Sequence, residues 1–193
     1  VDLKWEQNRQ LDLGFDIGIF DGRLNITADY YKKKSNDLLL NAPIPINSGF
    51  TSFTSNIGDI ESSGYELDLR GVVLNGSVKW TSQFNISFPS TKVLRLSETD
   101  YFFTGSWGHK SSVFVVKEGE ALGSIYGYVY DGVNQNEDEV ANLPQFGGTG
   151  AIGGPRYKDV SGPDGVPDGV IDSEYDRKII GNGLPDAFGG LTN

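Results

Sequence analysis

Residues 11–19 read LDLGFDIGI, with an apolar residue at every odd position and aspartate or glycine at every even one. Successive side chains of a β-strand point to opposite faces, so this stretch predicts a strand with one apolar and one polar face. The same alternation returns at residues 24–30, 65–70 and 78–88. The sequence therefore predicts an all-β protein with at least four two-faced strands.

Glycine turns join these strands in pairs. Asp21-Gly22 and Asn75-Gly76 are preferred centres of two-residue type I′ turns, because both central residues need positive φ. We therefore expect one hairpin around each turn. Much longer segments, residues 41–60 and 91–182, follow the second and fourth strands, and a fifth strand is expected to start near Asp186.

Short turns at one end and long loops at the other are typical of an antiparallel transmembrane β-barrel of an outer membrane. The apolar face would then meet lipid, with aromatic girdles at the two interfaces. The candidates for these girdles are Phe20, Tyr30, Tyr31, Trp80 and Phe88. So few strands cannot close a barrel, so this interpretation makes the chain a barrel segment. A soluble β-sandwich also alternates in this way and remains the alternative.

Composition excludes several classes of site. The chain has 193 residues, a net charge of -10, no cysteine and one histidine. Disulfides, thiolate metal sites and a histidine-based zinc site are excluded, and we expect His109 to lie in an exposed loop. The only lysine run is residues 32–34, which is too short for a nucleic-acid surface. No phosphate loop or nucleophile elbow is present, so we expect no enzyme.

An acidic stretch at residues 159–176 is the candidate metal site. Oxygen donors at alternate positions around a glycine turn suit calcium, which takes six to eight of them. The candidate ligands are Asp159, Ser161, Asp164, Asp168, Asp172 and Asp176. Extra residues at 162–167 break the spacing of an EF-hand loop, and a solvated acidic loop is the alternative. Catalytic paired carboxylates would have to flank a cleft, whereas these lie in a single run.

Aromatic residues gather in the segment 91–182. The candidates to face a substrate or a partner protein are Tyr101, Phe103, Trp107, Tyr126 and Tyr128. Aromatic faces stack on sugar rings and are favoured at protein interfaces. The same residues could instead form a small core of the loop itself. Residues 126–130 alternate like a further strand, which favours that last interpretation.

Several segments together resemble the SusC/RagA-like TonB-linked outer-membrane transporters. They are LKWE at 3–6, DYYKK at 29–33, SGF at 48–50, NIGDIE at 56–61, GYEL at 64–67, GEALGSIYGY at 119–128, YKD at 157–159, DGVID at 168–172, DR at 176–177 and IGN at 180–182. Each match is weak alone, but they follow the family order over nearly the whole chain. The acidic loop is longer here than is usual in the family.

The resemblance implies a 22-stranded barrel plugged by an N-terminal domain, with this chain as part of its C-terminal half. Residues 1–90 would hold two hairpins of barrel strands, residues 91–182 a long extracellular loop, and residues 183–193 the start of the next strand. The family imports glycan or peptide fragments across the outer membrane of Bacteroidetes. TonB supplies the energy through the plug, which lies outside this chain, and a SusD-like surface lipoprotein forms the lid. A soluble carbohydrate-binding β-sandwich with structural calcium, or a barrel without transport activity, are the other possibilities.

Overall fold

The computed structural model describes residues 3–43, 52–97, 99–107 and 110–193, and the side chains of 3–39, 54–56, 58–97, 99–105 and 113–193. The chain forms two compact units. The first contains residues 1–102, 116–122 and 184–193, and the second contains residues 103–115 and 123–183. Each unit is described by itself below.

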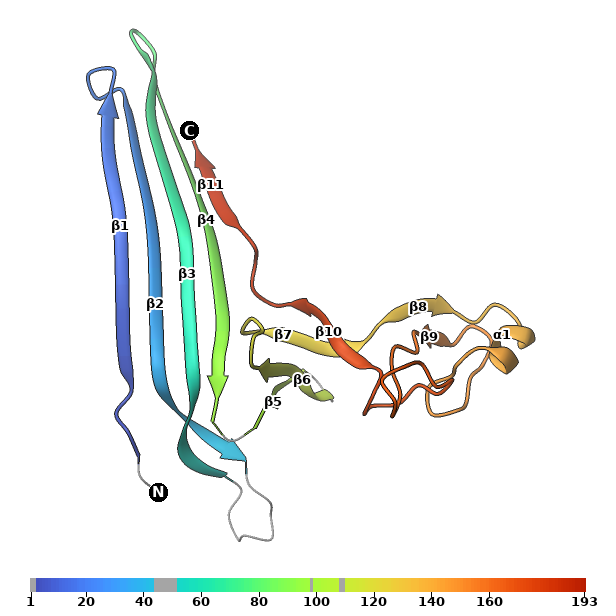
Figure 1. The fold of residues 1–193 in the computed structure, drawn as a ribbon. Helices are drawn as coiled ribbons and strands as arrows, with labels where there is room; N and C mark the ends of the chain where they lie inside the picture. The colour runs from blue at the N-terminus through green and yellow to red at the C-terminus, as the bar shows by residue number, and fades with distance from the viewer. Residues whose placement is uncertain (1–2, 44–51, 98, 108–109) are drawn as a thin grey trace. The chain divides into compact units, whose positions relative to one another are not determined.

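The first unit is built on a five-stranded antiparallel sheet in the order β1-β2-β3-β4-β11 (Figure 1). The strands are β1 (Gln7–Ile19), β2 (Leu24–Pro43), β3 (Ser52–Asn75), β4 (Lys79–Leu96) and β11 (Phe188–Thr192). β2 has 20 residues and β3 has 24, about twice what a strand needs to cross a bilayer. The predicted loop 41–60 is therefore too long, because strand structure continues to Pro43 and resumes at Ser52.

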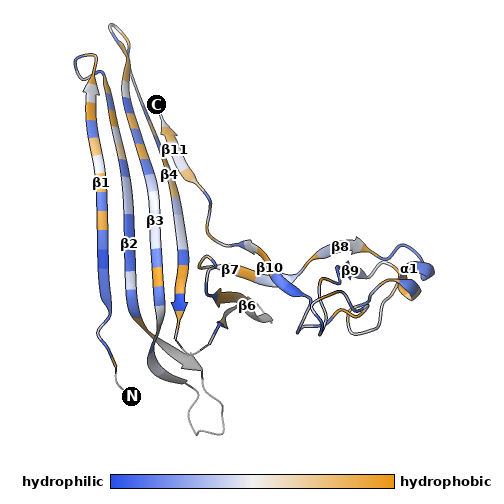
Figure 2. Cartoon of the chain, in the orientation of Figure 1, coloured by the Kyte–Doolittle hydropathy of each residue, from blue (hydrophilic) through white to orange (hydrophobic). Residues whose placement is uncertain are grey.

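One face of this sheet is apolar and exposed. In the register, Leu13 lies opposite Tyr30, which lies opposite Tyr65 in the next strand. Figure 2 shows apolar and polar residues alternating along β1, with a continuous hydrophilic stretch at its N-terminal end. Leu13 is 58% exposed and Phe15 is 54% exposed. A β-sandwich would bury these side chains between two sheets, so the structure does not support the sandwich alternative.

The two predicted turns differ in outcome. Asp21 and Gly22 have φ of 55° and 80°, and the Arg23 N–H donates to the Phe20 carbonyl at 3.1 Å, as a type I′ turn requires. The prediction at Asn75-Gly76 is wrong. A register shift between Val72 and Leu74 leaves Asn75 paired with Lys79, so residues 76–78 make the connection. An inserted residue of this kind is a β-bulge, and alternation does not reveal it in advance.

The aromatic residues of the sheet occupy both faces. Tyr30, Tyr65 and Phe88 form one row across β2, β3 and β4 on the apolar face, and the rings of Tyr30 and Tyr65 are 5.0 Å apart. Tyr31 lies opposite Gly64 in the register and therefore points to the polar face. Its assignment to a lipid-facing girdle is wrong, because neighbouring residues of a strand cannot share a face.

The second unit contains most of a four-stranded sheet in the order β10-β7-β6-β5, and a two-stranded sheet of β8 and β9. The strands are β5 (Tyr101–Trp107), β6 (Lys110–Lys117), β7 (Ser124–Tyr128), β8 (Tyr130–Val133), β9 (Pro155–Tyr157) and β10 (Arg177–Asn182). A short helix, α1 (Glu137–Asn142), starts at Asn136, whose side chain accepts from the Glu139 N–H at 2.9 Å. Ile171 and Asn134, each 1% exposed, mark its small core.

No helix in the described part of the chain has the length and hydropathy needed to cross a bilayer.

Candidate functional site

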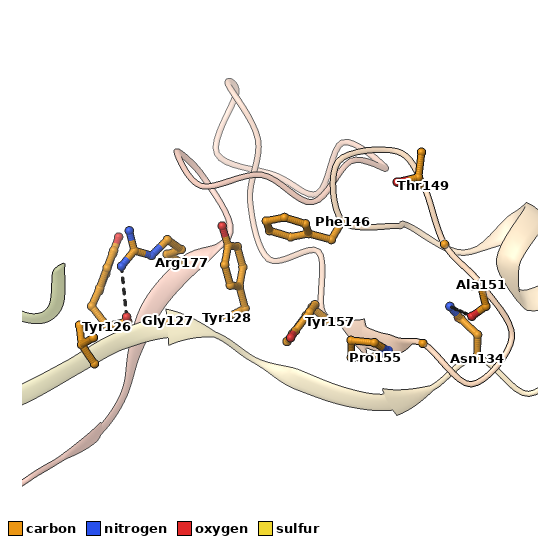
Figure 3. A pocket seen from close by; sticks show the side chains of 13 residues that line it. Tyr126, Gly127, Tyr128, Asn134, Phe146, Thr149, Ala151, Pro155, Tyr157 and Arg177 are labelled. Carbon is orange, nitrogen blue, oxygen red and sulfur yellow. Dashed lines mark hydrogen bonds between the residues drawn. The ribbon is translucent and has the colours of Figure 1, made fainter. Parts of the chain in front are cut away.

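A cavity of about 930 Å³ lies in the second unit (Figure 3). That volume is within the range of small-molecule binding sites, which are mostly apolar with a few polar groups. The lining residues are Val113, Tyr126, Gly127, Tyr128, Asn134, Phe146, Thr149, Gly150, Ala151, Gly154, Pro155, Tyr157 and Arg177. They come from strands β6, β7, β9 and β10 and from the segments between β8 and β9.

Three aromatic rings form one wall of the cavity. Tyr128 meets the edge of Phe146 at 5.0 Å between centroids and lies 5.4 Å from Tyr157. Figure 3 shows the three side chains pointing toward one another. Phe146 nevertheless remains 49% exposed, so the cluster does not bury all of its ring surface. Exposed aromatic faces of this kind stack on sugar rings or on flat side chains of a peptide.

Arg177 places a positive charge beside this wall. Its guanidinium carbon lies 4.9 Å from the Tyr126 ring centroid and 5.1 Å from that of Phe103, within cation–π range. One guanidinium nitrogen also donates to the Tyr126 carbonyl at 3.3 Å. Arg177 opens β10 and lies opposite Tyr128 in the register. The strand pairing therefore fixes where the charge sits.

Buried amides close the other end of the cavity. Asn134 Nδ2 donates to Gln145 Oε1 at 3.0 Å and to the Ala151 carbonyl at 3.3 Å. Gln145 Nε2 donates in turn to the carbonyls of Leu143 at 3.1 Å and Glu139 at 3.3 Å. Amides that satisfy one another in this way fix the loop conformation, because leaving one unpaired in a dry site is costly.

The Tyr128 hydroxyl stays protonated over the physiological range. Burial raises the pKa of Tyr128, and the nearby charges of Asp172 and Asp176 raise it further, against a lowering by Arg177. A neutral phenol both donates and accepts hydrogen bonds. The cavity therefore offers a ligand the Arg177 cation, the neutral Tyr128 hydroxyl among its hydroxyl groups, and several ring faces.

The acidic loop is organised around one buried carboxylate. Asp176 is 0% exposed and accepts from the N–H groups of Val160 at 2.8 Å, Ser161 at 3.4 Å and Asp172 at 2.9 Å. These three bonds tie both ends of the loop to the start of β10. Ile171, which is also buried, forms a β-bridge with Phe146 and so links the loop to the cavity wall.

The six predicted calcium ligands do not converge in the structure. Among the described residues, no group of three or more acidic or histidine side chains is placed to hold a metal ion. Asp159 has one oxygen that accepts from the Gly169 N–H at 2.6 Å, while its Oδ1 is buried with no hydrogen-bond partner. The Asp168 carboxylate lies beside Gly162, and Asp164 is exposed. Among the described side chains of this loop, Asp159 is the one with a buried oxygen that has no hydrogen-bond partner.

The predicted aromatic residues divide into three groups. Tyr126 and Tyr128 line the cavity, and Phe103 contacts Tyr126 at 5.4 Å between centroids. Tyr101, which is 49% exposed, does not belong to the lining. The side chain of Trp107 and the whole of His109 lie outside the described residues. Whether these aromatic residues face a substrate, face a partner protein or form a core of the loop stays a prediction.

Sequence reasoning missed Phe146, Tyr157 and Arg177 as site residues. Phe146 lies in an irregular segment, and Tyr157 in a strand of three residues, too short to show alternation. The segment YKD at 157–159 carries family resemblance, which was the one signal pointing to Tyr157.

Comparison with known proteins decides the family. A family described as "TonB dependent receptor-like, beta-barrel" matches residues 1–169. The chain belongs to the TonB-dependent receptor β-barrel family. This family consists of outer-membrane receptors and transporters rather than enzymes. The exposed apolar face of the antiparallel sheet is what such a barrel wall requires.

Relatives of this TonB-dependent receptor segment confirm the SusC/RagA-like resemblance. TonB-dependent receptor P3 of Formosa agariphila is 39% identical over 195 residues, covering 99% of this chain and 19% of that protein. TonB-dependent receptor SusC of Bacteroides thetaiotaomicron is 30% identical over 152 residues, covering 73% of this chain and 15% of its own. The chain therefore spans about a fifth or less of these relatives.

The fold agrees with that of two solved structures. The structure of the RagAB peptide transporter matches 97% of this chain and 19% of its own chain, with a TM-score of 0.73 at 20% identity. A second structure, of the RagAB peptide importer in the closed-closed state, gives a TM-score of 0.70. At this level of identity the two structures support the fold of the TonB-dependent receptor segment alone.

Proposed function

We propose that this chain forms part of the wall and the substrate-facing loops of a transporter in the bacterial outer membrane. The observation that carries the proposal is the exposed apolar face of one antiparallel sheet in a TonB-dependent receptor chain. Strands β2 and β3 of this sheet are longer than a bilayer crossing requires. The chain also contains a second unit with an aromatic cavity. The complete protein would import a nutrient with energy supplied through TonB, and a SusD-like surface lipoprotein would form its lid.

The cavity favours an oligosaccharide or a peptide as cargo. Ring faces of Tyr128, Phe146 and Tyr157 suit stacking, and Arg177 suits a carboxylate or several hydroxyl groups. A sugar and a peptide both meet these requirements, so each is tested separately.

The test uses the intact transporter that contains this chain, in cells and in purified form. Labelled oligosaccharides and labelled peptides would be offered in parallel uptake assays. We expect Tyr128→Ala and Tyr157→Ala to weaken binding about tenfold, which corresponds to about 1.4 kcal/mol. Tyr130→Ala is the matched control, because Tyr130 lies two residues away, is 61% exposed and does not line the cavity. Uptake of neither cargo, or equal loss in the control, would refute the assignment.

We propose further that the acidic loop takes up calcium, with Asp159 and Asp168 as the first candidates to hold it. The support is the buried, unpartnered Oδ1 of Asp159 and the acidic surroundings. Bound calcium would offset part of the negative charge of the loop and stiffen it. Adding calcium should then slow proteolysis within residues 155–180, and Asp159→Asn should abolish that protection. The exposed Asp164→Asn is the control, and protection that ignores calcium would end the proposal.

A further inference from the structure

A row of basic side chains lies just beyond the aromatic row on the apolar face. Four residues face one another across the sheet: Arg9 of β1 opposite Lys34 of β2, Lys34 opposite Glu61 of β3, and Glu61 opposite Lys92 of β4. Because residues in register share a face, all four point to the same side as Leu13, Tyr30, Tyr65 and Phe88. Three of the four are cationic, in a chain whose net charge is -10.

The acidic residues near this row already have partners. Glu61 pairs with Lys32 at 3.0 Å. Asp59 and Asp37 pair with Arg95 at 3.2 Å and 3.7 Å. In the described part of the chain, no ion pair within 4 Å joins Arg9, Lys34 or Lys92 to a carboxylate, although the charge of Asp59 is felt by Lys34. Arg9 and Lys92 are exposed. The row therefore carries cationic charge that its own chain does not neutralise.

The direct opposition of Arg9 and Lys34 is unfavourable by itself. Like charges opposite each other in neighbouring strands destabilise the pair. An anion from outside the chain would remove that cost and bind both side chains.

The height of the row matches a lipid headgroup layer. The row lies four residues beyond Tyr30 along β2, about 13 Å at the usual strand rise, or about 10 Å above the aromatic row once the strand tilts. Aromatic girdles mark the edge of the hydrocarbon, and headgroups lie immediately outside it. The short turns at 20–23 and 76–78 lie at the opposite end of the strands, so the row faces the outer leaflet.

We propose that Arg9, Lys34 and Lys92 bind the phosphate groups of an anionic glycolipid of the outer leaflet. The proposal rests on the membrane placement proposed above. Arg9 on the edge strand β1 offers a bidentate fork to phosphate, and Lys34 on β2 and Lys92 on β4 offer flexible point charges further along the row. Lys32, one row nearer to the membrane, stays engaged with Glu61. The aromatic row beneath would contact the upper part of the acyl chains.

The test measures lipid binding by the purified intact transporter, with native mass spectrometry in detergent as the readout. The probes are lipid A carrying both phosphates, the same lipid without phosphates, and inorganic phosphate. We expect the unaltered protein to retain the phosphorylated lipid at least tenfold better than the dephosphorylated lipid. The triple variant Arg9→Gln, Lys34→Gln, Lys92→Gln should lose this preference.

Lys33→Gln is the matched control, because Lys33 sits at nearly the same height on the polar face of β2. It should retain the full preference. Equal binding of both lipids, an unchanged triple variant, or displacement by millimolar inorganic phosphate would overturn the proposal. A protein that fails to insert into the outer membrane at all would instead refute the proposed function, and insertion is scored separately by surface labelling in cells.

Discussion

The ring of Tyr31 in β2 lies against the backbone of Gly64 in β3. A Cβ atom on Gly64 would stand 2.7 Å from Tyr31 Cζ and 2.8 Å from its Cε1, closer than carbon atoms normally approach. The two residues are opposite each other in the register, on the polar face of the sheet. Glycine at this position therefore gives the tyrosine ring room to lie flat along the strand, which fixes one side chain on the wet side of the wall.

Gly64→Ala should consequently destabilise the barrel by about 1–3 kcal/mol, because the added methyl group must displace the ring. Thermal unfolding of the purified intact protein measures this. Gly76→Ala is the control, since nothing lies within 4 Å of a Cβ placed there. Combining Gly64→Ala with Tyr31→Ala should remove most of the extra cost. If the double variant is as unstable as the two single losses added together, the ring is not the cause.

Asp176→Asn should loosen the acidic loop. The substitution removes the negative charge that three backbone N–H groups share and turns one acceptor into a donor, which should cost about 2–3 kcal/mol. Hydrogen exchange at the amides of Val160 and Asp172 reports the change directly. Asp164→Asn, at an exposed position in the same loop, should leave those amides protected. Equal exchange in the two variants would contradict a central role for Asp176.

Arg177→Lys should weaken the second unit despite preserving the charge. A lysine ammonium cannot lie flat over two rings while donating to the Tyr126 carbonyl, so we expect a loss of about 1–2 kcal/mol. Local unfolding followed by exchange at β7 and β10 is the measurement. The reverse substitution at the exposed neighbour, Lys178→Arg, should change nothing. A stable Arg177→Lys protein would show that charge alone suffices.

Acid should destabilise the pairing of β2 with β3 at the end that contains Asp37 and Asp59, away from the short turns. Burial tends to raise the pKa of Asp59, but hydrogen bonds from Arg95 and from the Asp37 N–H outweigh it, so the pKa lies below its ordinary value. A lowered pKa in the folded state stabilises the fold above the unfolded value of about 3.9. That contribution is lost as the pH falls from there through the folded value. Arg95→Gln should flatten this dependence, as followed by proteolysis between pH 5 and pH 2; an unchanged profile would show that another group titrates.

The alternation of apolar and polar residues predicted the sheet well. When the two faces of a strand meet different surroundings, every second residue is selected for the same face. The pairing of residues 11–19 with 24–32 follows from Asp21-Gly22 alone. Prediction failed where one residue is inserted. The register shifts beyond Ser35 and between Val72 and Leu74 change the face of the sheet to which the following side chains point. No residue type marks these shifts in advance.

The candidate site was less accessible to sequence reasoning. Tyr126 and Tyr128 could be proposed because β7 alternates. Their partners Phe146 and Arg177 lie roughly 20 and 50 residues away along the chain, joined by segments with little periodicity. Asp176 has a role in the structure that the sequence did not indicate. An acidic residue in a loop rich in carboxylates suggests a metal ligand, yet its observed contacts are backbone N–H groups, which only three-dimensional structure reveals.

The order of the five-stranded sheet leaves β1 with a neighbour on one side, among the strands that the structure describes. The outer edge of this 13-residue strand therefore presents unpaired backbone N–H and C=O groups beside an exposed apolar face. Such an edge is a template for any extended peptide, including another copy of itself. A preparation of this chain by itself should polymerise unless denaturant or a competing strand is supplied. A strand of the complete barrel that pairs with this edge would remove the hazard, because it would occupy the same hydrogen-bonding groups.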